Sequence, residues 1–359
     1  MTKARFLRSR RSFAFLGLPL AALGLGASLA VPAQSAGATS EPHAGQGLVY
    51  AKAAPGKPPA LRLRHATTIK MLTVPYFAVE QVAAAAGFFK RYNLNVQFIS
   101  QTSQGLGGIE AIISGQVQTG QSFGVMTPIE ADAAGASLTD VVSSETSSFG
   151  DYRFYVLKSS NITSCQSIIG KTVGVVNIGS YADVALTAYL ARCHLPLNSV
   201  NRITVPLNAM CSALLHNQVD VVGMYSLFYV PCVGEGGSQI RMLFKDSDVL
   251  PSAKLYAAFL FTNSYIHHHP AVIRAFVAAI KDASKFVRSH PVEAKDIIAG
   301  ATGISAANMI VPTYPRGNCI NPQAARAWTS YLIRFGVIKA GAVQPTQWWT
   351  NAYNPGCPK

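Results

Sequence analysis

A strand–turn–helix pattern occurs twice in this chain, and the repeat constrains the fold more than any other feature of the sequence. The two copies are residues 68–78 and 172–182, and in each a short β-branched run ends in a turn before a helical pattern begins. A second pair, residues 111–123 and 213–225, repeats at nearly the same offset as a helix end, a polar turn, a buried strand and a loop. The alternative interpretation is that any two βαβ units look alike. We predict two similar α/β lobes.

The second copy also predicts where a ligand binds. Its strand ends in the turn Gly179-Ser180, and a helical pattern follows at once. A Ser at a helix start can cap the helix, and the free backbone N–H groups there point beyond the strand end. In open α/β sheets, ligands bind in the crevice at the carboxyl ends of the strands. We therefore expect a ligand site at these strand-end loops.

The composition fits a globular protein with two cores. The chain has 359 residues, of which 49% are hydrophobic and 13% charged, which argues against disorder. The formal net charge of +14 includes five basic residues of a leader, and without them 25 basic residues stand against 16 acidic ones, a net charge of +9. Because Lys and Arg are scattered and form no recognisable module, we expect no nucleic-acid partner. The excess charge favours solubility and attracts anions.

Residues 1–38 form a predicted secretory signal peptide, with a basic start, an apolar run over 13–31 and small residues at 36–38. Residues 9–16 resemble the twin-arginine export motif, and an ordinary leader with two arginines is the alternative. Gly and Pro residues interrupt the apolar run, which disfavours a permanent membrane anchor. With no Cys near the end of the leader, we expect a periplasmic or extracellular protein without a lipid anchor. Residues 39–66, rich in Pro, Gly and Ala, are predicted to be a flexible linker.

Six cysteines in an exported chain predict disulfides. Fifteen pairings are possible, and nearest-neighbour pairing fits the predicted elements best. The predicted pairs are Cys165–Cys193, Cys211–Cys232 and Cys319–Cys357. No CxxC or Cys/His spacing typical of a metal site occurs, so we expect no metal.

The predicted elements place two connections between the lobes. The alternating strand 152–157 carries the chain into the second lobe, and the apolar segment 255–261 returns it to the first. Lobe I is therefore predicted as residues 67–152 and 255–359, and lobe II as residues 153–254. After the return the chain is predicted to be helical, over 270–288, 292–299, 305–310 and 322–335.

Three segments resemble a known family. Residues 84–96, AAAGFFKRYNLNV, are similar to the "GFFKKEGLDVEL" turn of that family. Residues 111–120, AIISGQVQTG, are similar to its "AL.SGQVD.G" segment. The third similar segment consists of residues 170–174 together with 179–181. The chain from about 67 to 335 resembles the periplasmic substrate-binding proteins of ABC importers, in the nitrate/sulfonate/taurine-type group that also contains pyrimidine-precursor binders. The resemblance implies a type II periplasmic-binding fold of two doubly wound α/β lobes with a hinge and an interlobe cleft. It also implies delivery of a small molecule to an ABC permease, without chemistry. We expect a monomer.

The sequence departs from the family pattern at a few positions. Asn93 stands where the family prefers Gly, and Gln118 replaces an Asp that Asp220 keeps in the second lobe. The yeast pyrimidine-synthesis branch carries a cysteine cluster around its active site, and nothing similar occurs here. The run His267-His268-His269 precedes Pro270 at a predicted helix start, where adjacent side chains do not share one face. We therefore expect neither catalysis nor a cofactor. A sensor that reports to a membrane receptor remains the alternative, and an enzyme on the same fold is less favoured.

The strand-end loops supply two kinds of predicted ligand contact. Hydroxyls beside helix N-termini can bind an anionic or carbonyl group, and aromatic rings can stack on a planar ring or pack an aliphatic chain. The predicted ligand-contacting residues are Tyr76, Phe77, Gly107, Ser122, Phe123, Ser144, Asn177, Ser180, Tyr181, Met224 and Tyr225. Arg153 is the nearby cation, either at the site or a solvated strand residue. The predicted ligand is a small sulfonate, carboxylate or heteroaromatic compound.

Overall fold

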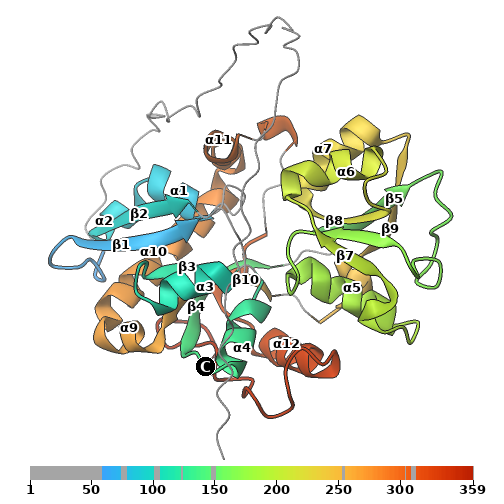
Figure 1. Cartoon of the computed structure of the whole chain (residues 1–359). Helices are drawn as coiled ribbons and strands as arrows, with labels where there is room; N and C mark the ends of the chain where they lie inside the picture. Colours follow the sequence, from blue (N-terminus) through green and yellow to red (C-terminus); the bar gives the residue numbers. More distant parts are fainter. Residues whose placement is uncertain are drawn as a thin grey trace, which may run out of the picture. The chain divides into compact units, whose positions relative to one another are not determined.

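The computed structural model describes residues 59–73, 79–100, 106–122, 124–146, 151–252, 255–303, 305–308 and 313–358. The predicted signal peptide and most of the predicted linker lie outside these residues. The described part contains two sheets of five strands each, with helices packed on them (Figure 1). This confirms the predicted α/β fold of two lobes, called lobe I and lobe II below after their sheets.

Lobe I is built on a sheet with the strand order β2-β1-β3-β10-β4. Its strands are β1 (Thr67–Thr73), β2 (Leu94–Ser100), β3 (Thr119–Ser122), β4 (Leu138–Thr146) and β10 (Leu255–Thr262). Strand β1 pairs in parallel with β2 and β3, whereas β10 runs antiparallel between β3 and β4. Its helices are α1 (Val79–Ala85), α2 (Phe88–Arg91), α3 (Leu106–Ile113), α4 (Met126–Ala133), α9 (Asn263–His268), α10 (Pro270–Ser289), α11 (Pro291–Thr302) and α12 (Pro322–Arg334).

Lobe II repeats this plan in the order β7-β6-β8-β5-β9. Its strands are β5 (Tyr152–Leu157), β6 (Thr172–Val175), β7 (Asn201–Thr204), β8 (Val221–Tyr225) and β9 (Ile240–Lys245). Strand β6 pairs in parallel with β7 and β8, and β5 runs antiparallel between β8 and β9. Its helices are α5 (Tyr181–Ala191), α6 (Met210–Leu215), α7 (Ser226–Gly236) and α8 (Asp246–Val249).

The two sheets match strand by strand. The first repeated segment forms β1 in lobe I and β6 in lobe II, and each is the second strand of its sheet. The second repeated segment forms β3 and β8, and each is the third strand of its sheet. The antiparallel strand in fourth place is the one that enters from the other lobe: β5 follows β4, and β10 follows β9. Two chain crossings therefore join the lobes.

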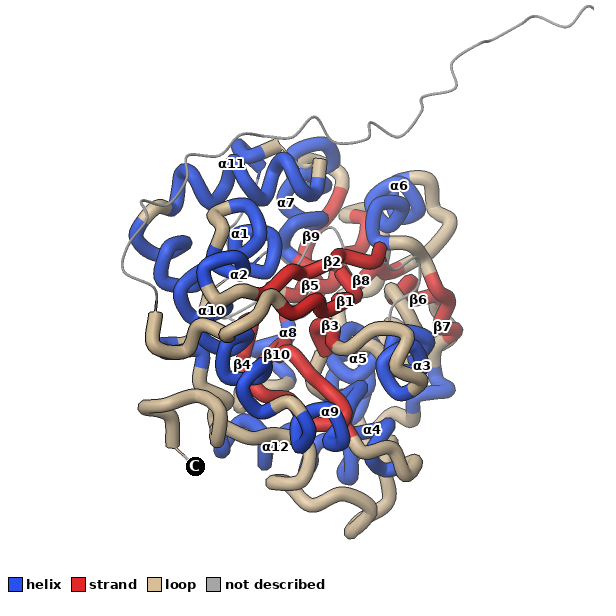
Figure 2. The backbone as a smooth tube through the Cα atoms, turned by 90° about the vertical axis from the view of Figure 1, so that its left-hand side faces the viewer, coloured by secondary structure: helices blue, strands red, loops and turns tan. Residues whose placement is uncertain are grey.

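Alternation along the strands of lobe I divides its core between the two faces of the sheet. Ile69 and Met71 of β1 lie in one buried cluster with residues of α1 and α10, and Leu72 lies in another with Ile112 of α3. Figure 2 shows α1, α2 and α10 together on one side of the strands. Phe276 of α10 fills the first cluster, with its ring centroid 5.3 Å from that of Phe259 on β10. Helices on both faces define a doubly wound lobe.

The helical segment after β1 is divided into α1 and α2, because Gly87 adopts the left-handed conformation between them, with φ of 78°. Asn93 is also left-handed, with φ of 60°, and its amide nitrogen donates to the carbonyl oxygen of Leu63 at 2.6 Å. Asn visits this conformation more easily than most residues, which explains how it replaces the Gly of the family pattern. A helix does begin at Pro270 after the histidine run, as the sequence predicts, with His269 as its N-cap residue, whereas His267 and His268 lie in the last turn of α9.

The C-terminal segment after α12 belongs to lobe I. Trp348 is fully buried, and its indole nitrogen donates to the hydroxyl of Thr329 on α12 at 3.2 Å. Trp349 forms a β-bridge with Asp140 of β4. Disulfides join Cys165 to Cys193, Cys211 to Cys232 and Cys319 to Cys357, the pairs that the sequence favours. The last of these closes the C-terminal segment onto the residues before α12.

Candidate functional site

The lobes contact each other at the carboxyl ends of their strands. Tyr225 is the last residue of β8, and its hydroxyl donates to the carboxyl group of Glu145 near the end of β4. Strand β4 points the same way as β3, because both run antiparallel to β10. Both side chains are 2% exposed. This hydrogen bond therefore joins the strand ends of the two sheets directly.

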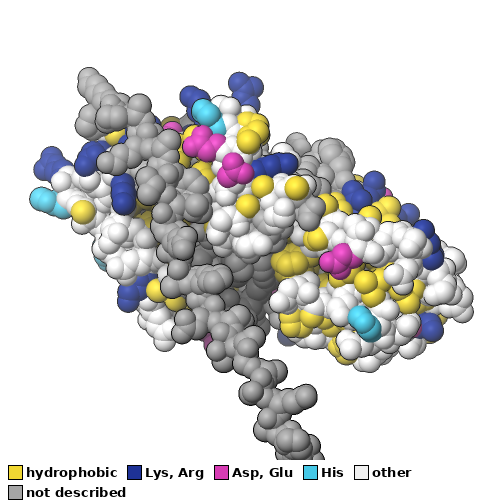
Figure 3. Space-filling view, turned by 90° about the horizontal axis from the view of Figure 1, so that it is seen from above, with side chains coloured by type: hydrophobic (Ala, Val, Ile, Leu, Met, Phe, Trp, Pro, Cys, Tyr) yellow, Lys and Arg dark blue, Asp and Glu magenta, His cyan; other side chains and the backbone are white. Residues whose placement is uncertain are grey.

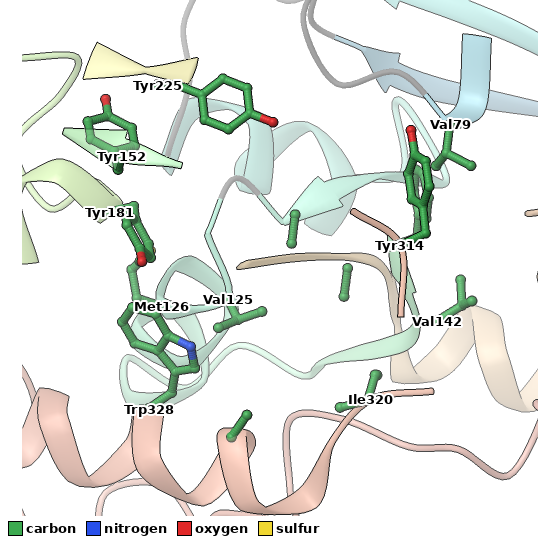
Figure 4. Close-up of a cluster of buried hydrophobic side chains, with 14 of the residues drawn as sticks. Val79, Val125, Met126, Val142, Tyr152, Tyr181, Tyr225, Tyr314, Ile320 and Trp328 are labelled. Carbon is green, nitrogen blue, oxygen red and sulfur yellow. The ribbon is translucent and has the colours of Figure 1, made fainter. Parts of the chain in front are cut away.

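Three tyrosines of lobe II form a cluster around this contact. The ring centroid of Tyr152 on β5 lies 5.6 Å from that of Tyr181 and 6.4 Å from that of Tyr225. The hydroxyl of Tyr181 donates to Asp246 at 2.9 Å, which fixes the ring at the start of α5. The ring of Tyr181 also contacts Trp328 of α12 in lobe I, and the two ring centroids lie 5.6 Å apart. Figure 4 shows Tyr181 above Trp328 of lobe I, with Tyr152 and Tyr225 farther from it on the lobe II side.

Two buried carboxyl groups lie on the lobe I side of the contact. Glu80, in the first turn of α1, is 1% exposed and accepts hydrogen bonds from Gln121 at 2.9 Å and from the hydroxyl of Thr73 at 3.3 Å. Burial raises the pKa of Glu80 to about 8. Burial also raises the pKa of Glu145 well above its ordinary value. The hydrogen bond from Tyr225 lowers this pKa, whereas the charges of Asp151 and Glu80 raise it further. The two carboxyl groups are thus close enough to oppose each other's ionisation.

Tyr314, which feels the charges of both carboxyls, lies in the segment between the short helices η3 (Ala306–Asn308) and η4 (Arg316–Asn318). It is 6% exposed, and its hydroxyl has no hydrogen-bond partner among the described residues. Burial raises the pKa of Tyr314 well above its ordinary value, and the charges of Glu145 and Glu80 add to the rise. Figure 4 shows its hydroxyl directed toward Val79, the residue before Glu80.

A second contact between the lobes joins α4 to the turn before α5. A Cβ atom at Gly179 would lie 3.6 Å from a carboxyl oxygen of Glu130, so the turn sits against α4. Burial, and then the charge of Asp183, raises the pKa of Glu130 to about 7. Asp183 accepts from the backbone N–H of Gly179 at 2.8 Å and from Arg202 at 2.6 Å. A carboxyl group of each lobe therefore faces the other here.

The structure brings some of the predicted site residues to this contact. Tyr181 and Tyr225 lie in the tyrosine cluster. Ser180 precedes α5, and its hydroxyl accepts from the backbone N–H of Asp183 at 3.4 Å, as the sequence predicts for a helix cap. The carbonyl oxygen of Asn177 accepts from the backbone N–H of Ser180 and closes the turn. Ser144 is buried on β4, and its hydroxyl lacks a partner within the described ranges.

Other predicted residues lie elsewhere. Met224 is fully buried in the core of lobe II, because it neighbours Tyr225 in a strand and so faces the opposite side of the sheet. Gly107 lies within α3, and Ser122 ends β3. Tyr76, Phe77 and Phe123 lie outside the described residues.

Arg153 also faces away from the tyrosine cluster. Its guanidinium lies over the ring of Tyr229, 4.5 Å from the centroid, and it lines a cavity of about 320 Å³ with Tyr155 and Arg241. Because Arg153 follows Tyr152 in β5, the two side chains point to opposite faces of the sheet.

Sequence reasoning missed the two carboxyls and Tyr314. Strand β4 runs from Leu138 to Thr146 and contains Glu145 near its end. Glu80 interrupts the apolar positions of α1, which include Val79, Val82 and Ala83. An acidic residue among apolar helix positions was the available signal for Glu80, and an acidic residue near a strand end was the signal for Glu145.

Over the described ranges, no group of three His, Cys, Asp or Glu side chains is arranged to hold a metal ion. The helices of the same ranges include none with the length and apolar character needed to span a membrane.

Comparisons with known proteins agree with this architecture. A Brucella abortus protein, named as a candidate binding protein with no stated ligand, is 22% identical over 65% of this chain and 70% of its own length. The periplasmic aliphatic sulphonate-binding protein SsuA of Escherichia coli has a TM-score of 0.65 at 19% identity, over 78% of this chain and 92% of its own. The periplasmic nitrate-binding protein NrtA of Synechocystis has a TM-score of 0.64 at 12% identity. The match covers 81% of this chain and 87% of NrtA. The chain thus has the fold of periplasmic binding proteins.

The family follows from a match over more than half of the chain. The NMT1/THI5-like family matches residues 74–294, and this chain belongs to it. A 4-amino-5-hydroxymethyl-2-methylpyrimidine phosphate synthase of Saccharomyces cerevisiae is also similar, 24% identical over 61% of this chain and 66% of its own length. Proteins similar to this chain are therefore mostly binding proteins, with an enzyme among the more distant ones.

Proposed function

We propose that this protein is an extracytoplasmic solute-binding protein, which captures a small organic molecule between its lobes and delivers it to an ABC importer. The observation that carries the proposal is the meeting of buried polar and aromatic side chains from both sheets at their strand ends, above all Tyr225 with Glu145. In doubly wound sheets this edge is the ligand-binding edge. A ligand held by both lobes would favour their closure around it.

The three disulfides and the predicted leader support an oxidising, extracytoplasmic location. Figure 3 shows Lys and Arg side chains spread over the visible face of the described residues rather than gathered in one patch, which fits a small-molecule partner better than a nucleic acid. The rings of Tyr152, Tyr181 and Tyr225 fit a planar or partly apolar ligand.

The test is to denature native protein and identify the small molecules that it releases. The released compound is then added back while small-angle scattering records the radius of gyration. We expect one compound at near-stoichiometric amount and a smaller radius with it bound. Tight binding without any change in the scattering curve would contradict closure between the lobes.

Two alternatives share the site. A sensor would bind the same ligand but associate with a membrane receptor, so binding to an ABC permease, tested with any that is encoded beside its gene, separates the two roles. The yeast synthase among the similar proteins keeps an enzyme as the second alternative. An enzyme would convert the released compound on prolonged incubation, whereas a binding protein returns it unchanged.

A further inference from the structure

We propose that the interlobe site recognises a positively charged nitrogen group, an ammonium or an amidinium, with Glu145 and Glu80 as its acceptors and the Tyr314 hydroxyl as a further acceptor. This inference rests on the proposed function and names the ligand class for the same site. It replaces the sulfonate and carboxylate classes that the sequence predicts.

The first step is the charge of the site. Neither Glu80 nor Glu145 forms an ion pair with Lys, Arg or His within the part of the chain that the structure describes. The charges that act on Glu145 are those of Asp151 and Glu80, both acidic. Around this site, acidic groups thus outweigh basic ones although the whole chain carries a net charge of +14.

The second step is the free-energy cost of that arrangement. Buried carboxylates are costly unless a cation or several donors compensate them. The donors present are the Tyr225 hydroxyl for Glu145, and Gln121 and Thr73 for Glu80. A ligand cation would supply the missing charge to both groups. A sulfonate or carboxylate would instead oppose the ionisation of both carboxyls, whose pKa burial already raises, and would gain no charge pair from them.

The third step is the hydroxyl of Tyr314, an independent observation that points to a ligand. The side chain is 94% buried, and its oxygen has no partner among the described residues, so its burial is uncompensated. The hydroxyl lies close enough to Glu145 and Glu80 to feel both charges. A phenol oxygen can accept a hydrogen bond from an N–H group, and an ammonium or amidinium carries several such donors.

The fourth step is the aromatic lining. The ring of Tyr225, whose hydroxyl donates to Glu145, packs with the rings of Tyr152 and Tyr181 on the lobe II side. The face of an aromatic ring attracts a cation, so the rings and the carboxyls favour the same kind of head group. Carboxyls on one lobe and rings on the other would then both hold the ligand.

The experiment compares three compounds that share a benzene ring and differ in the head group: benzamidine, benzoate and benzenesulfonate. Calorimetry on the full chain measures their affinities for the wild type, Glu145→Gln, Glu80→Gln and the control Glu235→Gln, an exposed residue of α7. We expect benzamidine alone to bind. Each of the first two variants should weaken it by about tenfold or more, since a buried charge pair is lost. The control should leave its affinity unchanged.

Tyr314→Phe separates binding from stability. If the hydroxyl serves the ligand, the variant should bind benzamidine more weakly while its stability to urea without ligand stays equal or rises, because an unpartnered buried hydroxyl is removed. A loss of stability with unchanged benzamidine affinity would mean that the hydroxyl has a structural role, and would overturn its place in the site.

The outcomes distinguish this inference from the proposed function. Tighter binding of benzoate or benzenesulfonate than of benzamidine, or a released native compound without a basic nitrogen, overturns the inference and leaves a solute-binding protein of another class. Equal affinity of wild type and Glu145→Gln for benzamidine overturns it as well. Absence of any released compound, together with no binding of the three probes, counts against the proposed function itself.

Discussion

The hydroxyl of Tyr225, the last residue of β8 in lobe II, donates to the carboxyl group of Glu145 on β4 of lobe I. Because each residue belongs to a different sheet, one hydrogen bond couples the position of one lobe to that of the other. The bond is also buried, so neither partner can exchange it for water without moving the lobes apart.

Tyr225→Phe should therefore lower the free energy of unfolding by about 1 to 3 kcal/mol, because a buried carboxyl loses a donor. Urea denaturation of both proteins measures the difference. Tyr331→Phe on α12, a partly buried tyrosine whose ring centroid lies 6.3 Å from that of Trp328, is the control and should stay within about 0.5 kcal/mol of the wild type. Equal losses in both variants would show that the Tyr225 hydroxyl has no special role.

Much of this fold was predictable from local patterns. The sequence repeat predicted that β1 corresponds to β6 and β3 to β8, and the alternation of residues 152–157 predicted strand β5. These signals are visible in the sequence because they depend on short-range periodicity. The period of two in a strand would also have separated Met224 from Tyr225, since neighbours face opposite sides.

The site was less predictable, because its members come together only through packing between lobes. Glu145 is buried by its contact with Tyr225, some 80 positions later in the chain. Tyr314 lies between two short 3₁₀ helices, where no periodicity marks a buried residue. Local sequence patterns therefore predict neither the contact of Glu145 with Tyr225 nor the burial of Tyr314.

Gly179→Ala tests the turn that faces α4. Gly179 has φ of 77°, in the left-handed region, so a Cβ atom is strained there even though the nearest neighbour lies at 3.6 Å. The unfolding free energy should fall by roughly 1 kcal/mol. Gly234→Ala, within α7 and with nothing within 4 Å, should instead raise it by up to about 1 kcal/mol. Thermal denaturation in parallel compares the two, and a stabilised Gly179→Ala variant would contradict the assigned backbone conformation.

The disulfides should each contribute to stability. Their cysteines are 28, 21 and 38 positions apart, and loops of this size correspond to about 3 to 4 kcal/mol in the chain-entropy account. Replacing Cys319 and Cys357 together by Ser should therefore lower the urea midpoint markedly. Peptide mapping without reductant should identify the three pairs. Free thiols in the exported protein, or a double variant as stable as the wild type, would refute this expectation.

The buried carboxyls predict how stability depends on pH. The pKa of Glu80 rises from 4.5 to about 8 on folding, so the folded state holds more protons than the unfolded state between these two values. Stability therefore falls as the pH increases through this window, by at most roughly 5 kcal/mol from this group. Glu130, with a pKa raised to about 7, and Glu145 act in the same direction.

Glu80→Gln should flatten this dependence, because the amide keeps the shape and an acceptor oxygen but cannot ionise. Urea denaturation of both proteins at several pH values between 5 and 8 gives the two slopes, and they should differ most about midway between 4.5 and 8. Glu110→Gln, an exposed residue of α3, is the matched control and should follow the wild type. If the Glu80→Gln slope equals that of the wild type, the Glu80 carboxyl ionises in the folded protein as readily as in the unfolded chain, and its burial at the lobe contact is wrong.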